Sequence, residues 1–85
     1  MIELAKSNGL WTITINRPEK ANSLTLEMLN ELVLIVESAG GAKAVIITGA
    51  GKVFSAGADL DQARAGLAVS DIWERLSGAI ENLPC

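Results

Sequence analysis

The chain has 85 residues, of which 49% are apolar and 20% charged, and its net charge at pH 7 is −3. This composition is typical of one small globular domain, and the acidic balance argues against nucleic-acid binding. The sequence has no His and one Cys, Cys85, so it predicts neither a Cys/His zinc site nor an intrachain disulfide. It shows no secretory signal and no apolar run of the roughly 20 residues that span a membrane, so we expect a cytoplasmic protein with no membrane partner.

The first predicted element is a β-hairpin. Two extended runs, 2–6 and 10–16, flank an Asn-Gly pair within residues 7–9, which supplies the positive φ angles of a tight turn. In the second run apolar residues alternate with threonines, so we expect one face of this strand to be buried. Pro18 then predicts a loop over 17–22.

A helix is predicted next. Thr25 is a suitable N-cap, Glu27 lies in the first turn, and apolar residues follow Leu29 at i+3, i+4 and i+7. Further apolar residues broaden this stripe, which indicates that the helix is covered on two sides. We expect Gly40-Gly41 to end it.

The remaining residues predict one buried strand, one short strand and two helices. The apolar run 44–48 is typical of a central parallel strand buried on both faces. After a Gly-rich turn, 53–55 is expected to be briefly extended, and 59–66 to be a short helix. A further helix should begin at a Ser70 cap and stop before Pro84. This order predicts an α/β fold with a crossover connection and no internal repeat.

Three motif interpretations fail on individual residues. Gly49 and Gly51 do not form a dinucleotide-binding loop, because Phe54 stands at the position of the third glycine. Val53 stands where a phosphate-binding P-loop needs Ser or Thr. Val53 also replaces the first glycine of a nucleophile elbow around Ser55, and a chain without His lacks the usual base. We therefore interpret Ser55 as a small, hydrogen-bonded structural residue.

The segment Gly57-Ala58-Asp59 predicts a strand-to-helix corner made of small residues. Backbone N–H groups at such a corner point outwards and can hold an oxyanion, and small side chains let a carbonyl oxygen approach. On these residues alone, the favoured interpretation is structural: Gly57 makes the turn and Asp59 caps the short helix.

Two segments together resemble the crotonase (enoyl-CoA hydratase/isomerase) superfamily: INRPEKANSLTLEML at 15–29 and AVIITGAGKVFSAGADL at 44–60. Their order and spacing match the N-terminal part of that family, and the similarity extends from the hairpin to Pro84. The resemblance implies a single partial domain over residues 1–85, the N-terminal part of a crotonase-like ββα spiral fold. It also implies an acyl-CoA hydratase or isomerase of fatty acid metabolism, with a coenzyme A thioester as substrate and no cofactor.

The same resemblance implies roles for individual residues. In the family, two backbone N–H groups stabilise the enolate-like oxygen of an acyl-CoA thioester, and Ala58 matches one of these positions. The residues implied to bind the substrate are Lys20, Ala21, Ser23, Ala56, Ala58, Asp59, Leu60 and Asp61. For Lys20, a phosphate contact and an ordinary solvated charge stay equally open. Asp59 is interpreted as a helix cap more than as a base.

The resemblance also indicates what these 85 residues do not supply. The second oxyanion amide and the two glutamates that add or remove water in hydratases belong to later parts of the family's sequence. We therefore expect this chain alone to be inactive, and a homotrimer or hexamer for a full-length member. The alternative hypotheses are a non-catalytic acyl-CoA-binding or interaction module, and a chain that does not fold independently.

Overall fold

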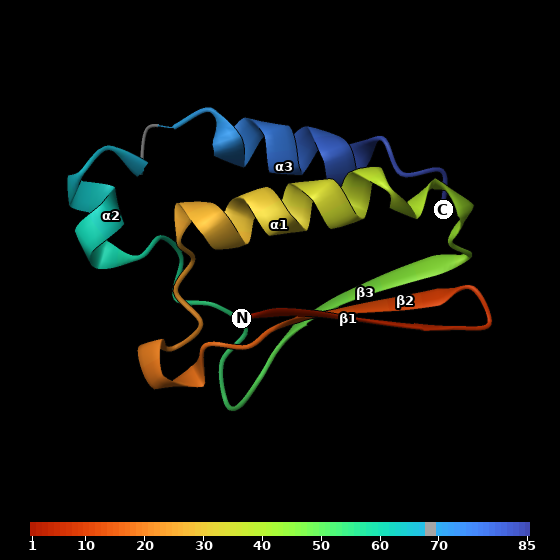
Figure 1. Ribbon diagram of the computed structural model, residues 1–85, viewed down its shortest axis with the longest axis horizontal. Coiled ribbons are helices and arrows are strands. Elements are labelled where there is room, and N and C mark those ends of the chain that lie inside the picture. Colours follow the sequence, from red (N-terminus) through yellow and green to blue (C-terminus); the bar gives the residue numbers. More distant parts are fainter. Residues whose placement is uncertain (68–69) are drawn as a thin grey trace.

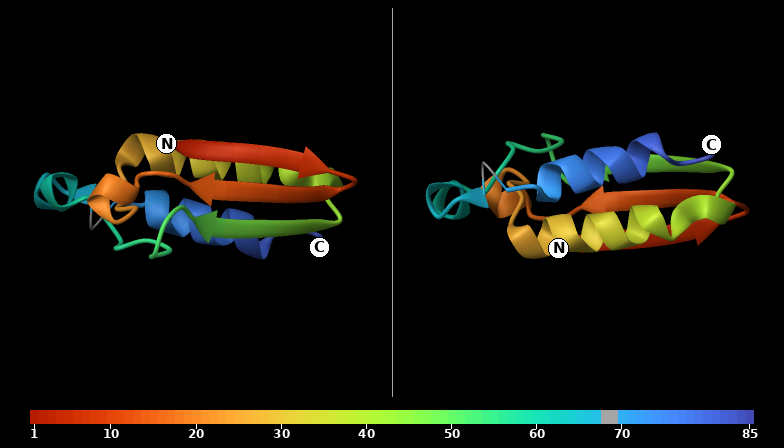
Figure 2. Two further views of the ribbon diagram at one scale, coloured as in Figure 1. Left: turned by 90° about the horizontal axis from the view of Figure 1, so that it is seen from below. Right: turned by 90° about the horizontal axis from the view of Figure 1, so that it is seen from above.

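The computed structural model describes residues 1–67 and 70–85, which form a sheet layer and a helix layer (Figure 1). The elements in chain order are β1 (Ile2–Ser7), β2 (Leu10–Ile15), the 3₁₀ helix η1 (Pro18–Lys20), α1 (Leu26–Glu37), the 3₁₀ helix η2 (Ala39–Gly41), β3 (Ala44–Gly49), α2 (Leu60–Arg64) and α3 (Ile72–Glu81). Helices α1 and α3 lie side by side over one face of the sheet, and α2 lies at one end of the molecule (Figures 1 and 2).

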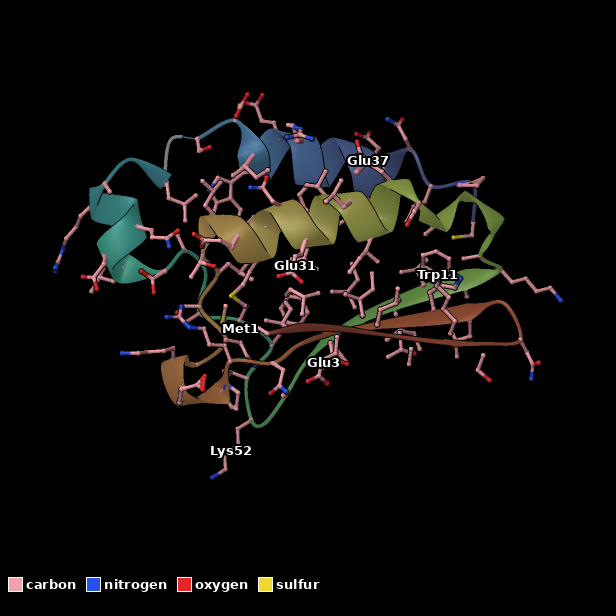
Figure 3. All side chains as sticks on the ribbon, in the orientation of Figure 1. Met1, Glu3, Trp11, Glu31, Glu37 and Lys52 are labelled. Carbon is pink, nitrogen blue, oxygen red and sulfur yellow. The ribbon has the colours of Figure 1, made fainter. Side chains whose placement is uncertain are left out.

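The sheet has the strand order β1-β2-β3. β1 and β2 pair antiparallel through the predicted hairpin, whose turn residues Asn8 and Gly9 have φ angles of 52° and 86°. β2 and β3 pair parallel, because α1 carries the chain back across the sheet between them. Trp11 lies near the turn end of β2, with the Lys6 ammonium 4.1 Å from the centre of its ring (Figure 3).

The hydrophobic core lies between α1 and the sheet. α1 begins where predicted, since the Thr25 hydroxyl accepts a hydrogen bond from the Met28 N–H at 3.2 Å. Its buried side chains are Met28, Leu29, Leu32, Val33 and Val36, which include the whole predicted stripe, and they pack with Ile13 and Ile15 of β2. The helix ends at Glu37 rather than at the glycine pair, and the glycines lie in η2.

The two later helices lie where the sequence predicted them, with shifted ends. The Asp59 side chain caps α2, which ends at Arg64 rather than at residue 66. The predicted Ser70 cap of α3 was wrong by one residue: the N-cap is Asp71, and the Ser70 hydroxyl accepts from the Ile72 N–H. α3 ends at Glu81, before Pro84. Among the described residues, no helix is long and apolar enough to cross a membrane.

Two local expectations were wrong. β3 is parallel as predicted but is not buried on both faces: it is the edge strand of the described sheet, its residues alternate in exposure, and Ile46 is 47% exposed. In the described part of the chain the helix layer covers one face of the sheet, so side chains on the other face, such as Ile46, are more exposed. Residues 53–55 form no strand, and the chain instead makes a single parallel bridge further on, between Ala58 and Leu24.

Gly49 offers a test of the turn after β3. A Cβ on Gly49 would lie 2.6 Å from the Val53 carbonyl oxygen and still closer to that of Phe54. Because backbone cannot move aside cheaply, Gly49→Ala should destabilise the fold by about 2 kcal/mol in urea unfolding. A Cβ on Gly78 of α3 meets nothing within 4 Å, so Gly78→Ala should stabilise the helix by about 0.5–1 kcal/mol. Equal effects of the two substitutions would contradict this account of the turn.

Candidate functional site

The candidate site is formed by two loops that leave neighbouring parallel strands. The first loop, residues 16–25, joins β2 to α1, and the second loop, residues 50–59, joins β3 to α2. Because β2 and β3 are parallel, both loops begin at the same edge of the sheet, and they lie at one end of the molecule (Figure 2). Lys52, at the tip of the second loop, projects away from the rest of the molecule (Figure 3).

Backbone hydrogen bonds join the two loops. They run from the Ala56 N–H to the Ala21 carbonyl (2.9 Å), from the Leu24 N–H to the Gly57 carbonyl (2.7 Å) and from the Asp59 N–H to the Leu24 carbonyl (2.8 Å). We refer to residues 56–59 as the corner. The first loop pairs with the corner through these bonds, and Leu24 and Ala58 form an isolated parallel bridge. Backbone hydrogen bonds therefore already hold the two loops together, and side-chain contacts add to them.

Asn22 is the polar centre of this unit and has no solvent exposure. Its side-chain amide donates to the carbonyls of Ala50 and Val53, and its side-chain oxygen accepts from the Arg17 N–H, each at 2.8 Å. Its φ of 56° is one that Asn tolerates better than most residues. One buried side chain therefore closes the first loop onto Arg17 and holds the second loop at two of its carbonyls.

Ser55 has the structural role that the sequence indicated. Its hydroxyl donates to the Asn22 carbonyl at 2.8 Å and accepts from the Gly57 N–H at 3.1 Å. Both bonds are internal to the loop pair. Gly57 itself has a φ of 97°, which only glycine adopts readily, so it makes the turn that starts the corner.

Three of the four backbone N–H groups of the corner donate a hydrogen bond to a described residue. Those of Ala56, Gly57 and Asp59 donate within the loop pair. The Ala58 N–H has no acceptor among the residues that the structure describes. The reason is geometric: in a parallel bridge the partner bonds to the residues on either side, so the N–H of the bridged residue points the opposite way.

A pocket of about 470 Å³ opens beside the corner and is lined by Lys20, Ser23, Ala56, Ala58, Asp59, Leu60 and Asp61. These are seven of the eight residues implied to bind the substrate. Ala21 is not among the lining residues; its carbonyl accepts the bond from Ala56. A larger groove of about 540 Å³ lies between the C-terminal parts of α1 and α3 and contains none of the predicted residues.

One ion pair connects the first loop with the corner. Nη1 of Arg17 lies 2.8 Å from Oδ2 of Asp59, and the two side chains are 17% and 14% exposed. The other oxygen, Oδ1, accepts from the Gln62 N–H at 3.1 Å and caps α2. The hydrogen bond from Arg17, with that from the Gln62 N–H, holds the pKa of Asp59 below its ordinary value. The geometry is that of an ionised cap rather than of a base.

Gln62 ties α2 to the start of α1. Its side-chain oxygen accepts from the Leu26 N–H at 2.6 Å, and its amide donates to the Glu27 carboxylate at 3.4 Å. Hydrogen bonds from the Glu27 backbone N–H and then from Gln62 lower the pKa of Glu27. α2, whose first residues Leu60 and Asp61 line the pocket, is therefore attached to the start of α1.

The comparisons with known proteins agree with this arrangement. The sequence model of the family described as Enoyl-CoA hydratase/isomerase matches residues 5–78. A probable enoyl-CoA hydratase of Rhodobacter capsulatus is 39% identical over 84 residues, which cover 92% of this chain and 33% of that protein. Enoyl-CoA delta isomerase 2 of Rattus norvegicus is 38% identical over 61 residues, covering 69% of this chain and 16% of that protein.

Solved structures show the same fold. An enoyl-CoA hydratase from Mycobacterium avium subsp. paratuberculosis K-10 has a TM-score of 0.82 at 35% identity, covering 98% of this chain and 32% of that one. An enoyl-CoA hydratase/isomerase from Pseudoalteromonas atlantica T6c has a TM-score of 0.82 at 30% identity, with coverages of 95% and 34%. The chain therefore belongs to the enoyl-CoA hydratase/isomerase family, and the fold is the N-terminal part of the crotonase fold. It spans about a third or less of the length of these relatives.

Replacing Asn22 tests the polar centre. Asn22→Ala removes a fully buried side chain and leaves two partly buried carbonyls and one partly buried N–H without their partner, so it should destabilise the fold by about 3 kcal/mol. Asn30→Ala, on the exposed face of α1, is the control and should change stability by less than about 0.5 kcal/mol. Urea unfolding of both variants measures the difference, and a mild effect at Asn22 would contradict its proposed role.

Acid unfolding tests the charge on Asp59. Because folding lowers the pKa of Asp59, its contribution to stability is fully present above the ordinary value of 3.8 and is lost as the pH falls through the lower folded value. Asp59→Asn keeps a capping side chain but removes this titration, so its stability should depend less on pH in the acid range. Chemical unfolding at a series of pH values gives the two profiles. Profiles of equal slope would show that the ion pair does not stabilise the folded chain.

Proposed function

We propose that the chain supplies one donor of an oxyanion hole, the backbone N–H of Ala58, and part of a coenzyme A cradle to an enoyl-CoA hydratase/isomerase site. The observation that carries this proposal is the unused Ala58 N–H. It is the one backbone donor of residues 56–59 without an acceptor in the described part of the chain, and Ala58 lines the pocket. Family membership supplies the class of reaction.

The chemistry requires a donor of this kind. When a proton leaves the α-carbon of an acyl thioester, or water adds to the β-carbon of an enoyl thioester, negative charge gathers on the thioester oxygen. A backbone N–H that is already held in place stabilises that charge without reorganising, and one such donor commonly contributes about 2.7–4 kcal/mol to lowering the barrier. The small side chains of Ala56 and Ala58 and the absence of one at Gly57 let the oxygen approach.

The pocket walls divide between the two parts of the substrate. Lys20 and Ser23 lie on the first loop, and their ammonium and hydroxyl groups can donate to the phosphate and pantetheine parts of coenzyme A. Ala21 belongs to the same stretch and accepts the bond that fixes Ala56. The residues that follow the corner, Ala58 to Asp61, would surround the thioester. The cradle thus lies on the first loop and the oxyanion donor on the second.

We further propose that the isolated 85-residue chain binds thioesters without turning them over. Hydration and isomerisation both need a general acid or base near the acyl carbons. Asp59 and Glu27 both have a lowered pKa and are engaged in hydrogen bonds, so neither suits that task. This leaves a binding role for the chain by itself, which the non-catalytic alternative shares. Hydration of crotonyl-CoA by the purified chain would overturn the inactivity.

An amide-to-ester exchange tests the oxyanion donor. Lactic acid in place of Ala58 removes the N–H and keeps the side chain. The ester costs no N–H bond within the described fold and only weakens the Gly57 carbonyl as an acceptor. The wild-type chain should bind crotonyl-CoA more tightly than free coenzyme A, and the Ala58 ester should reduce that preference by about fivefold, the value of one hydrogen bond.

The same exchange at Ala50 is the matched control. The Ala50 N–H donates to the Ile15 carbonyl at 2.8 Å, away from the pocket lining. The Ala50 ester should therefore lose more stability than the Ala58 ester but keep the thioester preference. Calorimetric titration and urea unfolding give both quantities. If the two esters lost the preference equally, Ala58 would not be the donor.

A further inference from the structure

Arg17 does not line the pocket, yet its guanidinium touches residues on both sides of it. Its Nη1 donates to Oδ2 of Asp59 at 2.8 Å and to the hydroxyl and carbonyl oxygens of Ser23 at 3.3 Å. Ser23 belongs to the cradle, and Asp59 belongs to the corner. A single nitrogen therefore links the two parts of the proposed substrate site.

Hydrogen bonds on both sides set the orientation of the corner, and Ala58 also packs against the hydrophobic core. At Gly57 the space where a Cβ would lie is open within 4 Å, so no side chain holds that residue in place. The peptide between Gly57 and Ala58 is held by the Leu24 bonds on one side and by Asp59 on the other. Asp59 in turn is held by Arg17 and by the Gln62 N–H. Release of the Asp59 carboxylate would remove one of the two restraints on this peptide and leave the Leu24 bonds to hold it.

We propose that Arg17 is a positioning residue of the thioester site, which acts through Asp59 to fix the direction of the Ala58 N–H. This inference rests on the proposed function. The pair suits that task, because it is largely buried and joined by a short charge-assisted hydrogen bond. The Arg64–Asp61 pair differs in both respects: its side chains are 72% and 93% exposed, and its atoms are 3.8 Å apart.

The test compares affinities for two ligands in the same variants. The quantity measured is the ratio of the dissociation constants for free coenzyme A and crotonyl-CoA, obtained by calorimetry on the 85-residue chain. A loss of folded protein weakens both ligands equally and leaves this ratio unchanged. Only a change in the contacts that the chain makes with the thioester group alters this ratio. The ratio therefore separates positioning from a merely structural role.

Arg17→Met should lower the ratio by about fivefold, towards one, as removal of the Ala58 donor would. Asp59→Asn should have the same effect, because an amide cannot form the ion pair. Arg17→Lys should give an intermediate ratio, since an ammonium can neutralise Asp59 without the guanidinium's geometry towards Ser23. Arg64→Met is the matched control: it makes the same chemical change at the exposed pair and should leave the ratio as in the wild type.

Each outcome decides a different question. No thioester preference in the wild-type chain would overturn the proposed function and this inference with it. A wild-type preference that persists in folded Arg17→Met would overturn the inference alone and leave the oxyanion proposal standing. If Arg17→Met does not fold, Asp59→Asn decides, because Asn still caps a helix. A preference retained in Asp59→Asn would then overturn the positioning role.

Discussion

The pairing of Leu24 with the corner is the interaction on which the rest of the site depends. Its N–H and carbonyl bind the Gly57 carbonyl and the Asp59 N–H, and so join the β2–α1 and β3–α2 connections into one unit. The same two bonds decide which backbone groups stay unused, because they take the groups on either side of Ala58. The position of Ala58 in the pocket wall and its unused N–H therefore have a common origin in this pairing.

The core and the site are held by different forces. α1 is fixed against β2 by buried apolar side chains, from Met28 in the first turn of the helix onwards, and Leu24 of the first loop joins the same cluster. The loop itself holds its shape through a buried amide whose donors and acceptor are all satisfied. Such a network adds little net stability, but it penalises every other arrangement of the chain. The apolar core therefore places the loops, and the polar network sets their detailed geometry.

Local rules predicted the parts of the structure that are local. The Asn-Gly turn, the Thr25 and Asp59 caps and the stripe of α1 each depend on residues within a few positions of one another. The contacts of Asn22 and the Arg17–Asp59 pair span 28, 31 and 42 residues, and nothing in a single sequence marks such partners. The burial of β3 was wrong for a similar reason: its residues suit a strand covered on both faces, whereas cover depends on the neighbours it has.

The structural and functional interpretations of the corner do not compete. Gly57 does make the turn and Asp59 does cap α2, as the favoured structural interpretation held. Yet the carbonyls of Ala21 and Leu24 and the hydroxyl of Ser55 accept the N–H groups of Ala56, Asp59 and Gly57, and within the described part of the chain only the Ala58 N–H of residues 56–59 has no acceptor. A corner built only to turn the chain has no need of an unused donor on a residue that lines a pocket. Because internal hydrogen bonds account for the neighbouring N–H groups, the unused N–H of Ala58 is the one that supports a functional role.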